Sequence, residues 1–316
     1  MNIVLATDDN YIQHCAVTIV SILVNNPKGV NIYILHEGLC EDSIHILEDE
    51  VHPYDSELQF VYVDKNIIDA FPMPKQGHLS HISRATYYRL LMADIMPPEV
   101  EKVIYLDCDL VVNDKLDDFW AIDITGYSIA GCVQIGAGCE ALRLGYPQKY
   151  GYINAGVLLI NLSYWREINA SKLLVEYLAA HYDKIIFHDQ DALNANFYDK
   201  CLHIDQRWNM NNGTFGDIDV RCDKEGNVIV NNYDAEKANI RRYQENPSIL
   251  HYSARIKPWD SRCTHPKLDL YYDYAHRTLH YRTIPYPSTF TKKYAIFRMK
   301  AIAVGVKIKH FILSKL

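Results

Sequence analysis

The stretch Lys102-Val103-Ile104-Tyr105-Leu106-Asp107-Cys108-Asp109-Leu110-Val111-Val112 decides the fold of this chain. Apolar and aromatic residues fill positions 103–106 without alternating with polar ones, which is typical of a parallel strand covered on both faces. Side chains two positions apart on an extended segment point to the same side. The pattern therefore predicts a buried strand over 103–107, with the carboxylates of Asp107 and Asp109 on one side and Cys108 on the other.

Two carboxylates at the end of such a strand are a candidate site for a divalent cation. They repel each other unless a cation lies between them, and ligands of open α/β sheets bind beyond the carboxyl ends of the strands. Asp-x-Asp occurs three times, at Asp107/Asp109, Asp189/Asp191 and Asp217/Asp219, and only the first follows a buried-strand pattern. The alternative for an isolated Asp-x-Asp is a polar turn, so the choice depends on the other motifs.

Composition indicates a globular body with a basic appendage. The 316 residues are 49% hydrophobic, enough to bury a sizeable core, and the net charge of −7 argues against a general nucleic-acid binder. Residues 291–316 contain seven Lys or Arg and no Asp or Glu, so the rest of the chain carries a balance of −14. We therefore expect a globular domain over 1–285 and a basic, aromatic tail over 286–316 with its own partner.

Cysteine usage and the N-terminus favour a cytoplasmic setting. The eight cysteines are scattered and form no Cys-x-x-Cys pair, which is typical of a reducing compartment. Residues 1–5 lack the basic start and long apolar core of a signal peptide. The chain contains no stretch of 18 uncharged apolar residues, so no spanning helix is expected.

Hydrophobic periodicity alternates between strands and helices. Strands are expected over 3–7, 30–35, 58–63, 103–107, 127–133, 155–161 and 248–252, and helices over 11–25, 41–51, 83–96, 164–182, 189–198 and 268–281. The opening βαβαβ order predicts a parallel sheet with helices on its faces. Loops are expected over 72–77, 134–152 and 209–246, with a candidate hairpin around 224–227.

Four short motifs are read together: Ala6-Thr7-Asp8-Asp9-Asn10-Tyr11, Tyr105-Leu106-Asp107-Cys108-Asp109, Asn154-Ala155-Gly156-Val157 with His188-Asp189-Gln190-Asp191, and His251-Tyr252 with Lys257-Pro258-Trp259. Their order and spacing resemble the family-8 retaining glycosyltransferases, which include glycogenin and bacterial galactosyl- and glucosyltransferases of the lipopolysaccharide or lipooligosaccharide core. The resemblance covers roughly residues 1 to 280. It implies an α/β, GT-A-like, single Rossmann-type domain with a mixed, mostly parallel sheet.

The resemblance implies a nucleotide-sugar site at the first motif. Ala6, Asp8 and Asn10 would bind the uracil and ribose. Asp8 and Asn10 are also good helix N-caps, and both roles can hold at once. Arg89 would lie near the donor, and Arg84 has a weaker claim to the same role. Asp107 and Cys108 complete the implied donor contacts.

A divalent metal, Mn²⁺ or Mg²⁺, is implied between Asp107, Asp109 and His251, with the donor diphosphate completing its shell. Carboxylate, imidazole and phosphate suit manganese, and the ion would act as a Lewis acid on the departing diphosphate. Lys257 would contact the diphosphate as a second cation. The alternatives are that His251 is structural and Lys257 a surface lysine. Ala254 stands where the family usually has a glycine, whose positive φ an alanine adopts only at a cost.

The donor sugar is implied to lie between Asn154, Asp189 and Gln190. Asp189 would accept hydrogen bonds from sugar hydroxyls, and Gln190 would lie below the anomeric carbon. Because a neutral amide is a poor nucleophile, front-face attack is favoured over a covalent intermediate. Asp191 could instead act like the second carboxylate of a retaining glycosidase. A further alternative is that Asp189 only caps a helix.

The expected activity is the transfer of galactose or glucose from a UDP-sugar to a saccharide acceptor, with retention. The acceptor would be lipopolysaccharide core or another lipid-linked glycan, and no nucleic-acid partner is expected. Attraction to anionic lipid is worth about 1 kcal/mol per basic residue near the surface, so the tail 291–316 predicts peripheral binding at the inner face of the cytoplasmic membrane. Its basic residues do not share one face of a helix, and a solvated tail is the alternative.

Two other functions stay open at this point. A glycogenin-like protein would glucosylate a tyrosine of its own chain, and 24 tyrosines are available. A nucleotide-sugar-binding protein with only hydrolytic activity would keep the metal site without a specific acceptor.

Overall fold

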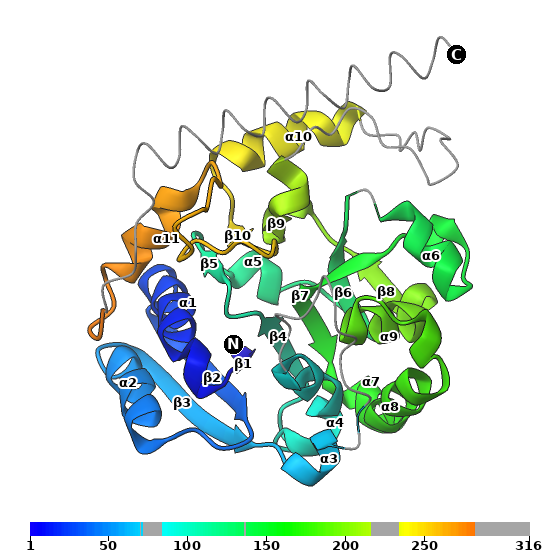
Figure 1. Cartoon of the computed structure of the whole chain (residues 1–316), viewed down its shortest axis with the longest axis horizontal. Coiled ribbons are helices and arrows are strands. Elements are labelled where there is room, and N and C mark those ends of the chain that lie inside the picture. Colours follow the sequence, from blue (N-terminus) through cyan, green and yellow to red (C-terminus); the bar gives the residue numbers. More distant parts are fainter. Residues whose placement is uncertain (70, 72–83, 136, 216–233, 282–316) are drawn as a thin grey trace.

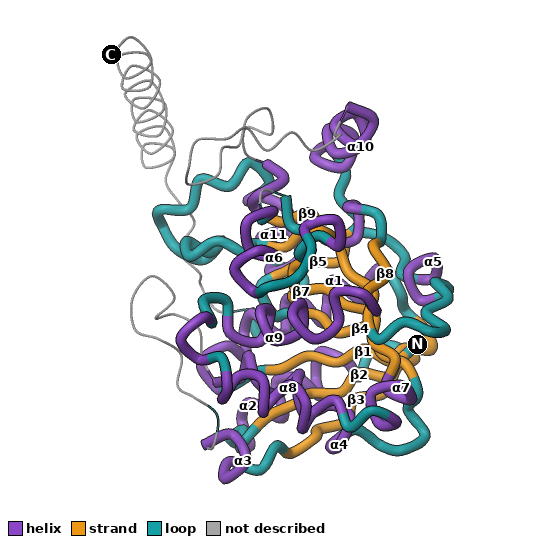
Figure 2. Tube along the Cα trace, turned by 90° about the vertical axis from the view of Figure 1, so that its right-hand side faces the viewer, coloured by secondary structure: helices purple, strands orange, loops and turns teal. Residues whose placement is uncertain are grey.

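The computed structural model describes residues 1–69, 71, 84–135, 137–215 and 234–281. Within these residues, a seven-stranded sheet in the order β3-β2-β1-β4-β7-β6-β8 forms the centre, and helices cover both of its faces (Figure 1, Figure 2). Its strands are β1 (Asn2–Ala6), β2 (Lys28–His36), β3 (Asp55–Tyr62), β4 (Lys102–Leu106), β6 (Ile129–Val133), β7 (Ile153–Asn161) and β8 (Cys201–His203).

The helices of the described residues lie between strands or follow the last one in the chain, together with 3₁₀ helices such as η1 (Asp9–Tyr11) and η2 (Arg84–Leu91). They are α1 (Ile12–Asn25), α2 (Glu41–Val51), α3 (Lys65–Asp69), α4 (Met92–Ile95), α5 (Asp117–Trp120), α6 (Gly138–Leu144), α7 (Leu162–Glu167), α8 (Ala170–Ala180), α9 (His188–Phe197), α10 (Asp234–Glu245) and α11 (Leu268–Ala275).

Packing on both faces explains the uninterrupted apolar run of β4. Val103 and Tyr105 belong to the core beneath η2, α8 and α9. Ile104 and Leu106 point the other way, into the core beneath α1 and α2. Each of these four side chains is at most 1% exposed, so no polar residue could be tolerated in the strand before its end.

The direction of β7 brings the third motif to the second. β7 runs antiparallel to β4, with Val157 opposite Leu106, whereas β1 and β4 are parallel. The start of β7 therefore lies at the carboxyl end of β4, where Asp107 N donates to Gly156 O at 2.9 Å. The mixed, mostly parallel α/β class is confirmed: β4 pairs in parallel with β1 and antiparallel with β7.

A second sheet of three strands lies beside α1: β5 (Leu110–Val112), β10 (Ile249–His251) and β9 (Met210–Asn211), in the order β5-β10-β9. One edge of β5 faces α1, and three polar side chains of that buried helix bind the backbone groups of this edge. Thr18 Oγ1 donates to Leu110 O at 2.9 Å, and Ser21 Oγ accepts from Val112 N at 2.9 Å. Asn25 Nδ2 donates to Val112 O at 3.0 Å. This pairing satisfies an edge that would otherwise be buried without partners.

The last described residues are fastened to α2. The buried carboxylate of Glu50 accepts from Leu279 N at 3.0 Å and His280 N at 3.1 Å. His280 Nε2 lies 2.7 Å from Asp49 Oδ2. We call this group of four residues the α2 clasp. Burial raises the pKa of Glu50, and the two backbone N–H groups oppose that rise.

Several predicted helices differ from those observed. The helix expected over 83–96 is the 3₁₀ helix η2 followed by the short α4, and its expected first residue, Ser83, lies outside the described residues. The helix over 164–182 is divided into α7 and α8 at Asn169, whose φ is +51°. The helix expected over 268–281 ends at Ala275.

Two predicted loops contain helices. Residues 134–152 include α6, which ends at Gly145 with φ +89°. Residues 209–246 include α10, whose mostly polar sequence buries Ile240 and Tyr243; two apolar contacts are too few for a clear helical period. The candidate hairpin at 224–227, the loop 72–77 and the tail 286–316 lie outside the described residues, so the division at 285/286 stays a prediction. Among the described residues, every helix is too short or too polar to cross a bilayer.

Candidate functional site

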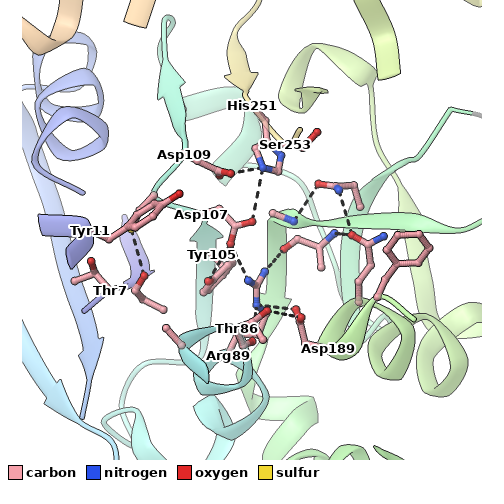
Figure 3. A pocket seen from close by; sticks show the side chains of 18 of the residues that line it. Thr7, Tyr11, Thr86, Arg89, Tyr105, Asp107, Asp109, Asp189, His251 and Ser253 are labelled. Atoms are coloured by element: carbon pink, nitrogen blue, oxygen red, sulfur yellow. Dashed lines mark hydrogen bonds and ion pairs between the residues drawn. The ribbon is translucent and has the colours of Figure 1, made fainter. Parts of the chain in front are cut away.

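One pocket opens where β1 and β4 end and β7 begins (Figure 3). Twelve of the residues predicted for the site line it: Ala6, Asp8, Asn10, Arg89, Asp107, Cys108, Asp109, Asn154, Asp189, Gln190, His251 and Lys257. They come from six separate parts of the chain: 6–10, 89, 107–109, 154, 189–190 and 251–257. The topology brings them together because parallel strands end at the same edge and β7 starts there. The side chain of Arg84, which had the weaker claim, lies outside the described part of the structure.

The first motif forms one side of the pocket. β1 ends at Ala6, and Asp8 caps η1 by accepting from Asn10 N at 3.0 Å. Tyr11, also at the pocket, meets the edge of the Trp259 ring with centroids 5.5 Å apart. Trp259 in turn stacks on His14, and burial lowers the pKa of His14 to about 3. The Asp8 cap fixes how the chain enters α1 while leaving the motif at the pocket surface.

Asp107, Asp109 and His251 converge on one point. One ligand atom from each lies within 4.8 Å of the others. His251 Nε2 is 3.1 Å from Asp109 Oδ1 and 3.7 Å from Asp107 Oδ2. Figure 3 shows the His251 imidazole beside the Asp109 carboxylate, with the Asp107 carboxylate below it. Two carboxylates and an imidazole form a donor set that suits Mn²⁺ or Mg²⁺.

Two features of the structure test whether a cation fits here. Asp109 Oδ1 is buried and accepts no hydrogen bond of good geometry from the described residues, although His251 Nε2 is close. Gly156 gives the group its room: a Cβ at this position would collide with the His251 ring and lie 2.6 Å from Asp107 Oδ2. The three residues therefore fit a divalent ion, which would supply the missing partner of Asp109.

Lys257 adds positive charge beside this group. Its Nζ lies 2.6 Å from Asp109 Oδ2 and donates to Tyr252 O at 3.0 Å. Burial alone would raise the pKa of Asp109, but Lys257 and His251 outweigh it and hold that pKa below its usual range. Asp109 is therefore ionised at neutral pH. The loop between His251 and Lys257 forms without positive φ at Ala254, whose N–H donates to Asn212 Oδ1 at 3.0 Å.

Arg89 joins the second and third motifs. Its buried guanidinium lies 2.8 Å from Asp107 Oδ1 and 2.9 Å from Asp189 Oδ2 (Figure 3). It also donates to Ala155 O at 2.6 Å and packs over the Tyr105 ring at 4.2 Å. Because Asp107 follows β4, Ala155 lies in β7 and Asp189 lies in α9, Arg89 fixes the spacing between these three elements.

Burial raises the pKa of Asp189 to about 6, although Arg89 and a hydrogen bond from Thr86 both lower it. Thr86 Oγ1 lies 2.5 Å from Asp189 Oδ1. Asp189 is 5% exposed and lies inside α9, whose N-cap is Phe187. The alternative that Asp189 is a helix cap is therefore wrong.

Gln190 is held by amide hydrogen bonds. Its Oε1 accepts from Ala155 N at 3.0 Å and from Asn154 Nδ2 at 3.1 Å. Its Nε2 donates to Gln134 Oε1 at 3.0 Å. The side chain is thus fixed at the pocket in one orientation, next to Asp189.

Asp191 faces away from the pocket and is enclosed. Its two oxygens lie 2.7 Å from Arg143 Nη2, 2.7 Å from the Tyr152 hydroxyl, 2.7 Å from Ile186 N and 2.9 Å from Phe187 N. Its side chain is fully buried. The alternative that Asp191 acts as a glycosidase-type carboxylate is wrong for this arrangement, because no oxygen of it is open to a substrate.

Sequence reasoning missed several residues that hold the site. Thr86, Gln134 and Asn209 each contact a predicted residue through a single polar group. None belongs to a motif or a periodic pattern. A single amide or hydroxyl carries no local signal in one sequence, so these residues emerge only from the structure.

The sequence of this chain is similar to those of known glycosyltransferases. The family model described as glycosyl transferase family 8 matches residues 2–263. A putative glycosyltransferase of Haemophilus influenzae is 31% identical over 269 residues, covering 84% of this chain and 74% of that protein. The lipopolysaccharide 1,3-galactosyltransferase of Salmonella typhimurium is 26% identical over 273 residues, covering 84% and 74%.

A solved structure has the same fold. It is the galactosyltransferase LgtC in complex with donor and acceptor sugar analogues, 24% identical, with a TM-score of 0.76 over 90% of this chain and 98% of that one. At this identity the likeness establishes the GT-A-like architecture.

Proposed function

The chain belongs to glycosyltransferase family 8, and on this premise we propose that it transfers galactose or glucose from a UDP-sugar to a saccharide acceptor with retention, forming an α-glycosidic bond. The observation that carries the proposal is the convergence of Asp107, Asp109 and His251 at the pocket, beside a glycine that leaves room for an ion. A divalent ion and a diphosphate are the groups that such a site accommodates best.

The nucleoside would lie along the first motif. Ala6 ends β1 and offers backbone groups, while Asp8 and Asn10 supply side-chain acceptors and donors at the pocket surface. Cys108, whose Sγ lies 3.3 Å from Ala6 O, links this side to the metal ligands. The diphosphate would then reach Lys257, the cation placed next to Asp109.

Asp107, Asp109 and His251 would hold Mn²⁺ or Mg²⁺. When bound, the ion supplies Lewis-acid stabilisation of negative charge on the departing diphosphate. Lys257 adds to that stabilisation from the protein itself, because its ammonium lies at the same carboxylate.

The sugar would lie between Arg89, Asn154, Asp189 and Gln190. Asp189, in its ionised form, accepts hydrogen bonds from sugar hydroxyls and so orients the ring. Gln190 places a neutral amide at the pocket, which favours electrostatic support of a developing positive charge over formation of a covalent ester. The leaving phosphate would take the proton of the acceptor hydroxyl on the same face.

The acceptor is proposed to be lipopolysaccharide core or another lipid-linked glycan. Support comes from the activity named for the Salmonella typhimurium relative and from the basic composition of residues 291–316. The protein would then work in the cytoplasm, peripherally at the inner face of the membrane.

A UDP-release assay tests the donor and the metal. Purified protein is incubated with a panel of UDP-hexoses, with and without Mn²⁺, and UDP is quantified. We expect metal-dependent release with UDP-galactose or UDP-glucose, and loss of that release in His251→Ala. The absence of metal-dependent release with every donor would contradict the proposal.

Intact-mass measurement separates transfer from the two other functions. A stepwise gain of hexose units on the protein would indicate self-glucosylation, as in glycogenin. Free hexose without any glycosylated acceptor would indicate hydrolysis. The proposed transferase gives neither as its main product once a suitable glycan acceptor is present.

A further inference from the structure

Asn209 is a fully buried amide between two parts of the site. It is 0% exposed and lies just before β9. Its Nδ2 donates to Asn154 Oδ1 at 2.8 Å, and its Oδ1 lies 3.1 Å from His251 Nδ1. Asn209 therefore connects the strand that starts at the pocket with the histidine of the metal group.

The backbone of β7 fixes which atom of each amide faces which neighbour. Gly156 N lies 3.1 Å from the Asn154 side chain. A backbone N–H can only donate, so the atom that faces it must be the amide oxygen of Asn154. The Asn209 atom that faces the same oxygen must then be its NH₂ group.

This polarity determines which ring nitrogen of His251 carries a proton. With its NH₂ directed to Asn154, Asn209 presents its oxygen to His251 Nδ1. An amide oxygen only accepts, so Nδ1 is the protonated nitrogen. In the neutral ring, Nε2 keeps its lone pair, and this lone pair faces Asp107 and Asp109. A lone pair opposite two carboxylates is unfavourable unless a cation lies between them.

A backbone N–H of β7 also fixes the orientation of the Gln190 amide, on the other side of Asn154. Ala155 N–H fixes the oxygen of Gln190 at 3.0 Å. Asn154 Nδ2 donates to that oxygen as well. Two neighbouring N–H groups of β7 thus set the direction of every amide from Gln190 to His251.

We propose that Asn209 is a positioning residue for metal binding. Gly156 N–H fixes the orientation of the Asn154 amide, and that amide fixes the orientation of Asn209. The Asn209 oxygen then holds the His251 ring with Nε2 available to a divalent cation. This inference rests on the proposed use of Asp107, Asp109 and His251 as metal ligands. Without Asn209, the neighbouring carboxylates would draw the single ring proton to Nε2.

The first test reads the tautomer directly. Protein with ¹⁵N-labelled histidine is studied by NMR without metal, at a pH where the ring is neutral, and the His251 signals are assigned by their loss in His251→Gln. We expect the proton on Nδ1 in the wild type and on Nε2 in Asn209→Ala. A wild-type proton on Nε2 would overturn the proposal without any variant being needed.

The second test measures Mn²⁺ affinity in the presence of UDP, from the EPR signal of free Mn²⁺. Loss of the contact that orients a ligating histidine typically costs 10- to 100-fold in metal affinity, and we expect about that loss in Asn209→Ala. Asn209→Asp keeps an acceptor for Nδ1–H but loses the donor to Asn154 Oδ1, so it should retain more of the affinity than Asn209→Ala. Full affinity in Asn209→Ala, or equal loss in both variants, would overturn the proposal.

Asn26→Ala is the matched control. Asn26 is also buried, donates to Ile22 O at 3.0 Å and accepts from Leu116 N at 2.8 Å, but it lies outside the pocket. Its loss should lower thermal stability without changing Mn²⁺ affinity. If the wild type binds no Mn²⁺ with UDP, the proposed metal-dependent function fails, while the NMR tautomer still decides whether Asn209 orients His251.

Discussion

At the scale of single residues, Gly156 sets the room beside the metal ligands. We predict that Gly156→Ala lowers Mn²⁺ affinity by at least about 100-fold, the upper end of what loss of a supporting contact costs. The added Cβ would collide with the His251 ring and lie 2.6 Å from Asp107 Oδ2, so one of these two ligands would have to move. Isothermal titration calorimetry with Mn²⁺ and UDP measures the effect.

Gly131→Ala provides the control for this change. A Cβ at Gly131 would lie 2.9 Å from Ile153 Cδ1, inside the same sheet but away from the metal group. Crowding of this kind costs about 1–3 kcal/mol of stability. Mn²⁺ affinity should stay unchanged, and an equal loss in both variants would mean that general strain, rather than Gly156 itself, governs binding.

Titration of Asp189 should produce the acidic limb of the pH profile of kcat/KM. Burial raises its pKa to about 6, so the proton is bound below that pH and the ionised acceptor exists above it. We expect kcat/KM to rise as pH increases through about 6. Thr86→Val should move this limb to higher pH, because the Thr86 hydrogen bond stabilises the ionised form.

Asp189→Asn should remove the limb altogether. A hydrogen bond to a charged group contributes about 1.5–3 kcal/mol, so kcat/KM should fall by roughly 10- to 100-fold. Initial rates across the pH range give both results. A variant that keeps the wild-type limb would assign it to another group.

At the scale of elements, Asp191 ties the start of α9 to α6. We predict that Asp191→Ala lowers the free energy of unfolding by about 3–5 kcal/mol, since it removes one of two carboxylate partners of Arg143 and leaves the Tyr152 hydroxyl and two backbone N–H groups without their acceptor. Chemical denaturation measures the change, and the exposed Asp199→Ala serves as control. Lost turnover with unchanged stability would instead favour a direct chemical role for Asp191.

Elements that bury a continuous or periodic apolar pattern were predictable from the sequence. The helix over 41–51 coincides with α2, and the strand over 103–107 differs from β4 by one residue at each end. The short strands β5 and β8 were not predicted, because three residues provide no period. The equally short β10 was expected, over 248–252. α10 was missed because its contacts depend on a partner surface far along the chain.

The residues of the candidate site were likewise predictable only where they belong to a motif. Asp107, Asp189 and His251 lie in motifs with recognisable spacing, and the structure places them at one pocket. Asn209 acts through bonds to residues 55 and 42 positions away, and Thr86 through a bond to a residue 103 positions away. Such contacts depend on the direction of β7 and the position of η2, which no local pattern specifies.

At the scale of the whole molecule, charge is divided between body and tail. We predict that the full chain co-sediments with vesicles containing anionic lipid and that deleting residues 291–316 abolishes this. The seven basic residues supply the attraction, so added salt should weaken it. Vesicles of zwitterionic lipid are the control, and unchanged pelleting of the truncated protein would contradict the prediction.

The α2 clasp gives this division a geometric consequence. The described chain ends beside α2 (Figure 1), where Glu50 holds the backbone of Leu279 and His280. If the tail anchors the enzyme to a bilayer, the tether starts from this fixed point. The clasp would then restrict the pose of the catalytic body, and so the angle at which the pocket mouth meets lipid-borne glycans, whereas the basic residues govern how firmly the body is held.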